Sequence, residues 1–145
     1  MALSILTKKF FAAFVREEKG SALVLVGLAA MMLLASAGIA IDMGRQQVVQ
    51  SRLSNALDSA GLAAGTMANS SDLNTIVQKY FYANYPVGFM GSTIANPTIV
   101  ANADNSILQL DVHGTVPTTF MRLFGMTTMA VSAHSEITRA NMGME

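Results

Sequence analysis

The chain contains no cysteine among its 145 residues. This absence excludes disulfide bonds, cysteine–zinc sites and catalysis by a thiol nucleophile. An exported domain without disulfides has to be stabilised by buried apolar surface, by a membrane or by assembly with partners. Tryptophan is also absent and methionine occurs eleven times, but neither count indicates a function.

Charged residues are scarce, because Asp, Glu, Lys and Arg make up 12% of the sequence against about 25% in average soluble domains. Nine basic and nine acidic side chains cancel, so the net charge is zero. Without a basic excess there is no general electrostatic attraction for nucleic acid, and we expect no nucleic-acid partner. Apolar residues reach 52%, which favours a membrane segment followed by one small domain.

A strongly apolar run without a charged side chain covers residues 21–41, SALVLVGLAAMMLLASAGIAI. A helix of this length spans about 31 Å at ~1.5 Å per residue, close to the ~30 Å hydrocarbon thickness of a bilayer. The rest of the chain has too little apolar surface to enclose such a helix on all sides as a soluble core. We therefore interpret residues 21–41 as one transmembrane helix.

Basic residues set the expected orientation of this helix. Four of them precede the apolar run: Lys8, Lys9, Arg16 and Lys19. Beyond it only Arg45 and Arg52 lie close, mixed with acidic residues. The positive-inside rule then places residues 1–20 in the cytoplasm and the bulk of the chain outside it.

A cleaved secretory signal is the alternative interpretation of the apolar run, with Ala35-Ser36-Ala37 as the small-residue cleavage site. The apolar region of such signals is about 7–15 residues long and precedes the site. Here the apolar region is longer and contains the site. This difference favours the transmembrane interpretation.

The pattern after the span predicts a helix over residues 42–68 that continues the membrane helix. Its apolar residues recur at three- and four-residue steps: Val49, Leu53, Ala56, Leu57, Ala60, Ala64 and Met67. Small residues at 60–65 allow close packing, either against the protein's own sheet or against another subunit. A break with Ser71 or Asp72 as N-cap then precedes a shorter predicted helix over 73–81.

The C-terminal part has the alternation of β-strands. Period-two patterns are clear at residues 108–116 and 129–138, and a weaker strand candidate covers 94–103. Pro117 suits the first turn of a short helix that Gly125 ends. The predicted fold class is α+β: a long N-terminal helix that includes the span, then a small antiparallel sheet of about three strands with short helices. Residues 69–145 would form an extracytoplasmic α+β domain.

No catalytic or metal-binding pattern emerges from the sequence. His113 and His134 lie on the polar faces of two predicted strands and could face each other. Two histidines without a third ligand at a recognisable spacing make a poor metal site. A nucleophile elbow and a glycine-rich phosphate loop are both absent from the sequence. We therefore expect no metal, no cofactor, no small-molecule substrate, no catalytic residues and no enzymatic activity.

Three charged residues of the predicted helix over 42–68 are candidates for partner contacts: Asp42, Arg45 and Asp58. Asp42 and Arg45 lie one helical turn apart, so they could pair with each other or with a partner. The alternative is that they form a polar end to the span and set its depth. Asp58 stands in a segment of small and apolar residues, where it could contact a partner or cap the edge of the sheet. The interpretation that the sequence favours for Asp58 is a solvated helix face.

Three stretches of the N-terminal half carry a resemblance through their order and spacing: EKGSA at 18–22, GIAIDMGR at 38–45 and LSNALDSAGLAA at 53–64. Together with the span they resemble the N-terminal module of TadE-like and TadG-like proteins of the Tad (tight adherence) system, which assembles Flp-type pili. The resemblance covers about residues 16–66. Longer TadG-like proteins carry a von Willebrand-like domain after this module, and the remainder of this chain is too short for one. The resemblance implies a short, minor-pilin-like member of bacterial origin.

The resemblance also implies a role and a location. The chain would be a structural or assembly component of the inner membrane, with membrane lipid and other pilus-assembly proteins or pilin subunits as partners. Lys19-Gly20 before the apolar run resembles a prepilin peptidase site, which would be cut between Gly20 and Ser21. Pilins of this kind usually have Glu at the fifth position after the cut, where this chain has Leu25, so we expect it to stay uncut. The alternative function is a membrane-tethered periplasmic binding module unrelated to pili.

Overall fold

The computed structural model describes residues 18–67, 72–104 and 106–139. The chain divides into two compact units, residues 1–40 and 41–145. Helix α2 (Glu18–Thr66) contributes residues to both units. Most of the segment expected in the cytoplasm, and the basic residues up to position 16, lie outside the described residues.

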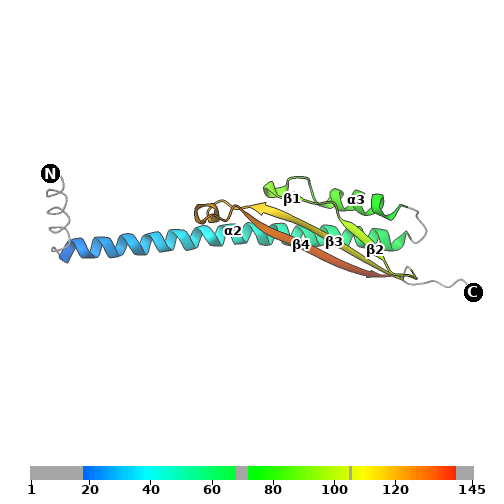
Figure 1. The fold of residues 1–145 in the computed structure, drawn as a ribbon, viewed down its shortest axis with the longest axis horizontal. Coiled ribbons are helices and arrows are strands. Elements are labelled where there is room, and N and C mark those ends of the chain that lie inside the picture. The colour runs from blue at the N-terminus through cyan, green and yellow to red at the C-terminus, as the bar shows by residue number, and fades with distance from the viewer. Residues whose placement is uncertain (1–17, 68–71, 105, 140–145) are drawn as a thin grey trace, which may run out of the picture. The chain divides into compact units, whose positions relative to one another are not determined.

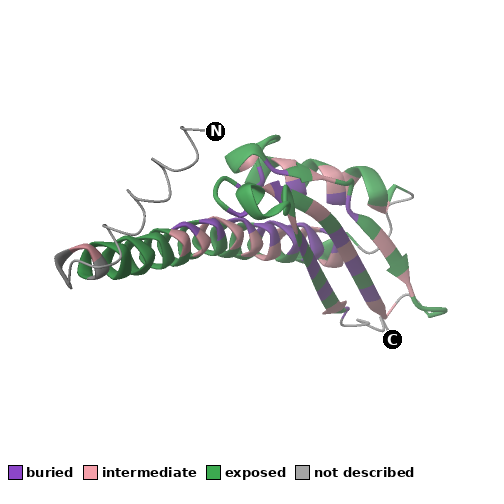
Figure 2. Cartoon of the chain, turned by 60° about the vertical axis from the view of Figure 1, so that its left-hand side comes forward, coloured by how far each residue is buried: buried purple, intermediate pink, exposed green. Residues whose placement is uncertain are grey.

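In the first unit, α2 exposes apolar side chains around its whole circumference. Met31 and Leu34 are 70% and 74% exposed, and Leu23, Leu25 and Leu33 are similarly open (Figure 2). Within the described part of the chain, one helix is long and apolar enough to cross a membrane, with candidate bounds Ala22–Thr66. A helix that is apolar on all sides is stable when lipid or protein covers it, so this segment is a membrane anchor or a signal.

The second unit combines the C-terminal half of α2 with helix α3 (Leu73–Asn84) and an antiparallel sheet. The sheet has four strands: β1 (Thr93–Ile94), β2 (Thr98–Ala101), β3 (Ile107–Pro117) and β4 (Thr128–Thr138). β4 pairs with β3 over its full length, while β1 and β2 share the other edge of β3 (Figure 1). Two short 3-10 helices, η1 (Phe89–Gly91) and η2 (Met121–Phe124), lie in the connections.

The core lies between one face of this sheet and the helices. Alternate residues of β3 and β4 are buried, and the purple bands of Figure 2 follow this alternation. The largest fully buried side chains are Tyr85, Phe81, Leu53, Leu57, Leu108, Leu110, Val49, Val77 and Val112. The opposite face of the sheet is polar, which is typical of an antiparallel sheet with one solvated side.

The glycines near the end of α2 create a notch for one side chain of the sheet. A Cβ atom at Gly61 would lie 2.9 Å from Ile137 Cγ1, and one at Gly65 would lie 3.0 Å from Ile137 Cγ2. These distances are shorter than normal carbon–carbon contacts, so Ile137 occupies space that any larger residue would fill. The small residues predicted at 60–65 thus pack closely against the protein's own sheet.

The structure confirms the predicted α+β class and corrects several details. The sheet has four strands, because the weak candidate over 94–103 is interrupted around Pro97 and forms both β1 and β2. Asp72 is the N-cap of α3 and accepts a hydrogen bond from the Thr75 N–H at 3.1 Å. The prediction that Pro117 opens a helix is wrong: Pro117 is the last residue of β3, and η2 begins at Met121.

Candidate functional site

Asp42 ties the beginning of the folded unit to the connection between β3 and β4. One carboxylate oxygen accepts the N–H of Thr119, and the other accepts those of Phe120 and Met121, each at 2.8 Å. The residue is only 2% exposed. The carboxylate thus satisfies three backbone donors that precede and begin η2, whereas Pro117 still pairs with Thr128 at the end of β3.

The protonation of Asp42 follows from these contacts. Burial raises the pKa of the Asp42 carboxyl, whereas the three backbone hydrogen bonds and the nearby Arg45 guanidinium lower it. The lowering effects are together the stronger, so this pKa lies below its ordinary value of 3.8. Asp42 is therefore a carboxylate at neutral pH and stays a hydrogen-bond acceptor.

Arg45 connects two loops of the same unit. Its Nη1 donates to Thr119 Oγ1 at 2.7 Å and its Nη2 donates to the Met90 carbonyl at 3.1 Å. Met90 has a left-handed backbone with φ 51°, which is costly for a residue with a side chain. The guanidinium holds this turn in place beside the segment that Asp42 binds.

Among the three charged candidates, Asp58 has a different setting from Asp42 and Arg45. Asp58 is exposed on α2, and its carboxylate has no hydrogen bond or ion pair with any residue of the described part. The structure thus uses Asp42 and Arg45 for contacts inside the chain and leaves Asp58 open to solvent. Of the three, Asp58 is the one that lies exposed at the surface, where a partner could reach its charge.

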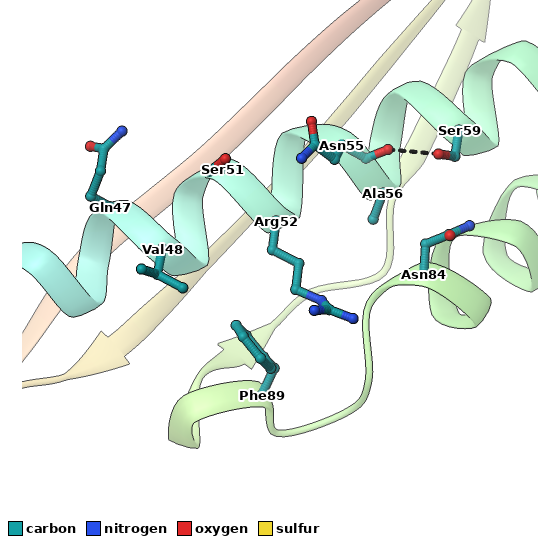
Figure 3. Close-up of a pocket in the computed structure, with 9 residues that line it drawn as sticks. All are labelled: Gln47, Val48, Ser51, Arg52, Asn55, Ala56, Ser59, Asn84 and Phe89. Carbon is teal, nitrogen blue, oxygen red and sulfur yellow. Dashed lines mark hydrogen bonds between the residues drawn. The ribbon is translucent and has the colours of Figure 1, made fainter.

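An open groove of about 580 Å³ is lined by α2 on one side and by the ends of α3 and η1 on the other. Its lining comprises Gln47, Val48, Ser51, Arg52, Asn55, Ala56, Ser59, Asn84 and Phe89 (Figure 3). The Arg52 guanidinium carbon lies 4.9 Å from the centroid of the Phe89 ring, a cation–π contact. Apolar surface from Val48, Ala56 and Phe89 lines this groove together with amides, hydroxyls and the Arg52 cation. No carboxylate is among the lining residues, so the groove suits an acidic ligand with an apolar part better than a cation.

The two histidines lie on the solvated face of the sheet. His134 Nδ1 is 2.9 Å from Asp111 Oδ1, and His113 is paired with Ser132 across the strands. The histidines are therefore diagonal neighbours and do not oppose each other directly. Within the described ranges no group of three or more His, Cys, Asp or Glu side chains could hold a metal ion.

Sequence reasoning missed the polar residues that fasten α2 to the sheet edge. Gln50 exchanges hydrogen bonds with the backbone of Ser132, and Gln46 donates to the Ala130 carbonyl at 2.9 Å. At the other end of α2, Arg139 Nη2 donates to the Ala64 carbonyl at 3.0 Å, near the negative end of the helix dipole. Glutamines on the polar side of an amphipathic helix give no signal of a strand more than 80 residues away.

Comparison with known proteins finds one family similarity, in the N-terminal part of the chain. Residues 20–68 match the family model Tad, described as putative Flp pilus-assembly TadE/G-like. No curated protein and no solved structure matches the chain. The similarity to the TadE/G-like Flp pilus-assembly family thus covers residues 20–68, which include most of the apolar segment, Asp42, Arg45 and the α2 wall of the groove. The sheet lies outside this match.

Proposed function

We propose that this protein is a membrane-anchored structural component that helps to assemble a Tad (Flp-type) pilus or a related secretion apparatus. One observation carries the proposal: within the matched domain, a single helix, α2, joins an exposed apolar segment to the α+β unit. The role is minor-pilin-like and mechanical, without enzymatic activity. The apolar segment holds the chain in lipid, and the unit from residue 41 onward meets other assembly proteins or pilin subunits.

The proposed location is the bacterial inner membrane, with one span, a cytoplasmic N-terminus and the α+β unit outside the cytoplasm. The excess of basic residues before the apolar segment supports this orientation. Because the chain lacks cysteine, a Val87→Cys variant has a single thiol, and Val87 is highly exposed. A membrane-impermeant maleimide should label it in intact spheroplasts. A Ser4→Cys control should be labelled only after lysis, and the reverse pattern would contradict the orientation.

We further propose that the N-terminus stays uncut. Gly20 and Ser21 both lie within α2, and Leu25 replaces the Glu that usually pairs with a neighbouring pilin's N-terminal amine. A chain that retains its N-terminal segment remains in the membrane as an assembly factor. Cleavage between Gly20 and Ser21 that depends on the prepilin peptidase would instead make it a pilin-like subunit.

Deletion and complementation test the role itself. Removing the gene should abolish or sharply reduce surface pili, counted by electron microscopy and in the sheared surface fraction, and the full chain should restore them. An Asp58→Lys variant should restore fewer pili if Asp58 contacts a partner, whereas a Thr66→Lys control on the same helix should complement fully. Normal piliation in the deletion strain would contradict the proposal.

The groove along α2 favours a second candidate function, a membrane-tethered binding module outside the cytoplasm. Arg52, Asn55 and Asn84 offer charged and amide donors to a polar ligand. Under this alternative, deletion leaves pili intact, while Arg52→Glu abolishes capture of an acidic peptide by the purified chain. Under the first proposal, the loss of pili on deletion is the decisive result.

A further inference from the structure

The connection between β3 and β4, residues 118–127, carries an exposed apolar tip. Leu123 is 82% and Phe124 62% exposed, and Met126 and Phe120 are also open. Arg122 adds a positive charge to the same turn. Large apolar side chains that gather on one exposed turn are typical of a site that binds a protein or a membrane.

This connection is internally fastened. The Thr118 N–H donates to the Thr127 carbonyl at 3.0 Å, and the Thr118 hydroxyl donates to the Met126 carbonyl. Inside the turn, Met126 N–H binds the Met121 carbonyl at 3.2 Å and Gly125 N–H binds the Arg122 carbonyl at 3.0 Å. These bonds pair many of the backbone N–H and C=O groups of the connection, while its apolar side chains are exposed. A segment that moves from water into lipid needs its backbone polar groups paired in this way.

The connection is also fixed beside the residue that follows the apolar run. Asp42 binds the N–H groups of residues 119–121 at 2.8 Å, and Asp42 directly follows Ile41, the last residue of the proposed span. Figure 1 shows the connection as a short coil beside α2, at the end of the sheet where β4 begins. If the span ends at Ile41, hydrogen bonds to Asp42 keep residues 119–121 close to the point where α2 leaves the bilayer.

We propose that the tip of this connection inserts into the outer interface of the same bilayer that α2 crosses. Leu123, Phe124 and Met126 enter the boundary between headgroups and acyl chains, and Arg122 meets lipid phosphate. The inference rests on the proposed membrane anchor. In this arrangement the connection gives the folded unit its own contact with lipid, in addition to the span. The bilayer, and not a protein partner, covers the apolar tip.

The absence of tryptophan from the sequence makes this insertion directly measurable. Phe124→Trp introduces a single fluorophore into the full chain, reconstituted at low density in phosphatidylethanolamine–phosphatidylglycerol vesicles that contain brominated phosphatidylcholine. Val100→Trp is the matched control, because Val100 is also 62% exposed. Val100 lies in β2, near the end of the sheet that packs on Gly61, and Gly61 is roughly 28 Å along α2 from Asp42. Leu28→Trp reports the span itself.

The expected result is blue-shifted emission from Phe124→Trp and bromine quenching severalfold stronger than for Val100→Trp. If Leu28→Trp is quenched while Phe124→Trp behaves like Val100→Trp, the interfacial contact is refuted and the anchor stands. If neither is quenched, both ideas fail. Emission of Phe124→Trp that shifts only as protein density rises, without bromine quenching, would assign the tip to a second copy of the chain and overturn the lipid contact.

Discussion

Asp42 shows how much one side chain contributes to the arrangement of this protein. Its carboxylate joins α2 to a segment 77 to 79 residues later in the chain. An Asp in this position is visible in the sequence, but its partners are not. The donors are backbone N–H groups, which every residue except proline has, so no residue type marks them. Sequence reasoning could therefore select Asp42 and Arg45 without finding what they bind.

Replacing Asp42 by Asn should destabilise the folded unit. The amide keeps one acceptor oxygen and places an NH₂ group against backbone N–H donors, so at least one of the three backbone donors loses its acceptor. We expect the thermal unfolding midpoint of the detergent-solubilised chain to fall by several degrees, measured by circular dichroism. Asp58→Asn is the control, because Asp58 is exposed, and it should leave the midpoint unchanged. Equal midpoints for the two variants would contradict the role given to Asp42.

The lowered pKa of Asp42 predicts a specific pH dependence. A group whose pKa is lower in the folded state than in the unfolded state stabilises the fold at pH values above its ordinary pKa, which is 3.8 for Asp42. That stabilisation is lost as the pH falls from about this value through the lower folded pKa. Asp72 and Asp104 also have lowered pKa values, so the wild type alone does not isolate one group. Denaturant titrations at a series of acidic pH values should show a shallower loss of stability for Asp42→Asn than for the wild type.

The helices and strands differ in how far local sequence determines them. The amphipathic stripe of α2, the Asp72 cap of α3 and the alternation of β3 and β4 are local signals, and all appear in the structure. The division of residues 94–103 into β1 and β2 depends on pairing with β3. The start of η2 lies where Asp42 accepts the backbone N–H groups of residues 119–121. Elements defined by distant partners were thus the ones that sequence reasoning misplaced.

Two glycines of α2 should respond in opposite directions to the same substitution. Nothing lies within 4 Å of a Cβ atom at Gly44, so Gly44→Ala should stabilise the helix by about 0.5–1 kcal/mol. At Gly61 the new methyl group would lie 2.9 Å from Ile137 Cγ1, and overpacking of this kind costs about 1–3 kcal/mol. Chemical denaturation of both variants tests the pair. Stabilisation by Gly61→Ala as large as that by Gly44→Ala would show that the notch is not tightly packed.

At the scale of the whole molecule, composition explains the two kinds of surface in the chain. A protein with few charges and no disulfides has one unit built around a helix–sheet core and one apolar helical segment that remains exposed. Length and hydropathy were sufficient to identify the segment as a candidate span. The groove beside Arg52 and the apolar tip at residues 122–126 were not predictable, because both depend on elements brought together by the fold.

The intact mass and N-terminal sequence of the protein recovered from membranes, with and without the prepilin peptidase, test the central claim most directly. Anchoring by the apolar segment of α2, together with an uncut N-terminus, predicts a membrane-bound chain whose N-terminus precedes residue 21 whether or not the peptidase is present. A peptidase-dependent N-terminus at Ser21 would leave the anchor in place and make the chain a pilin-like subunit. A soluble product that begins after Ala37 would contradict the account, because the apolar segment would then be a signal and not an anchor.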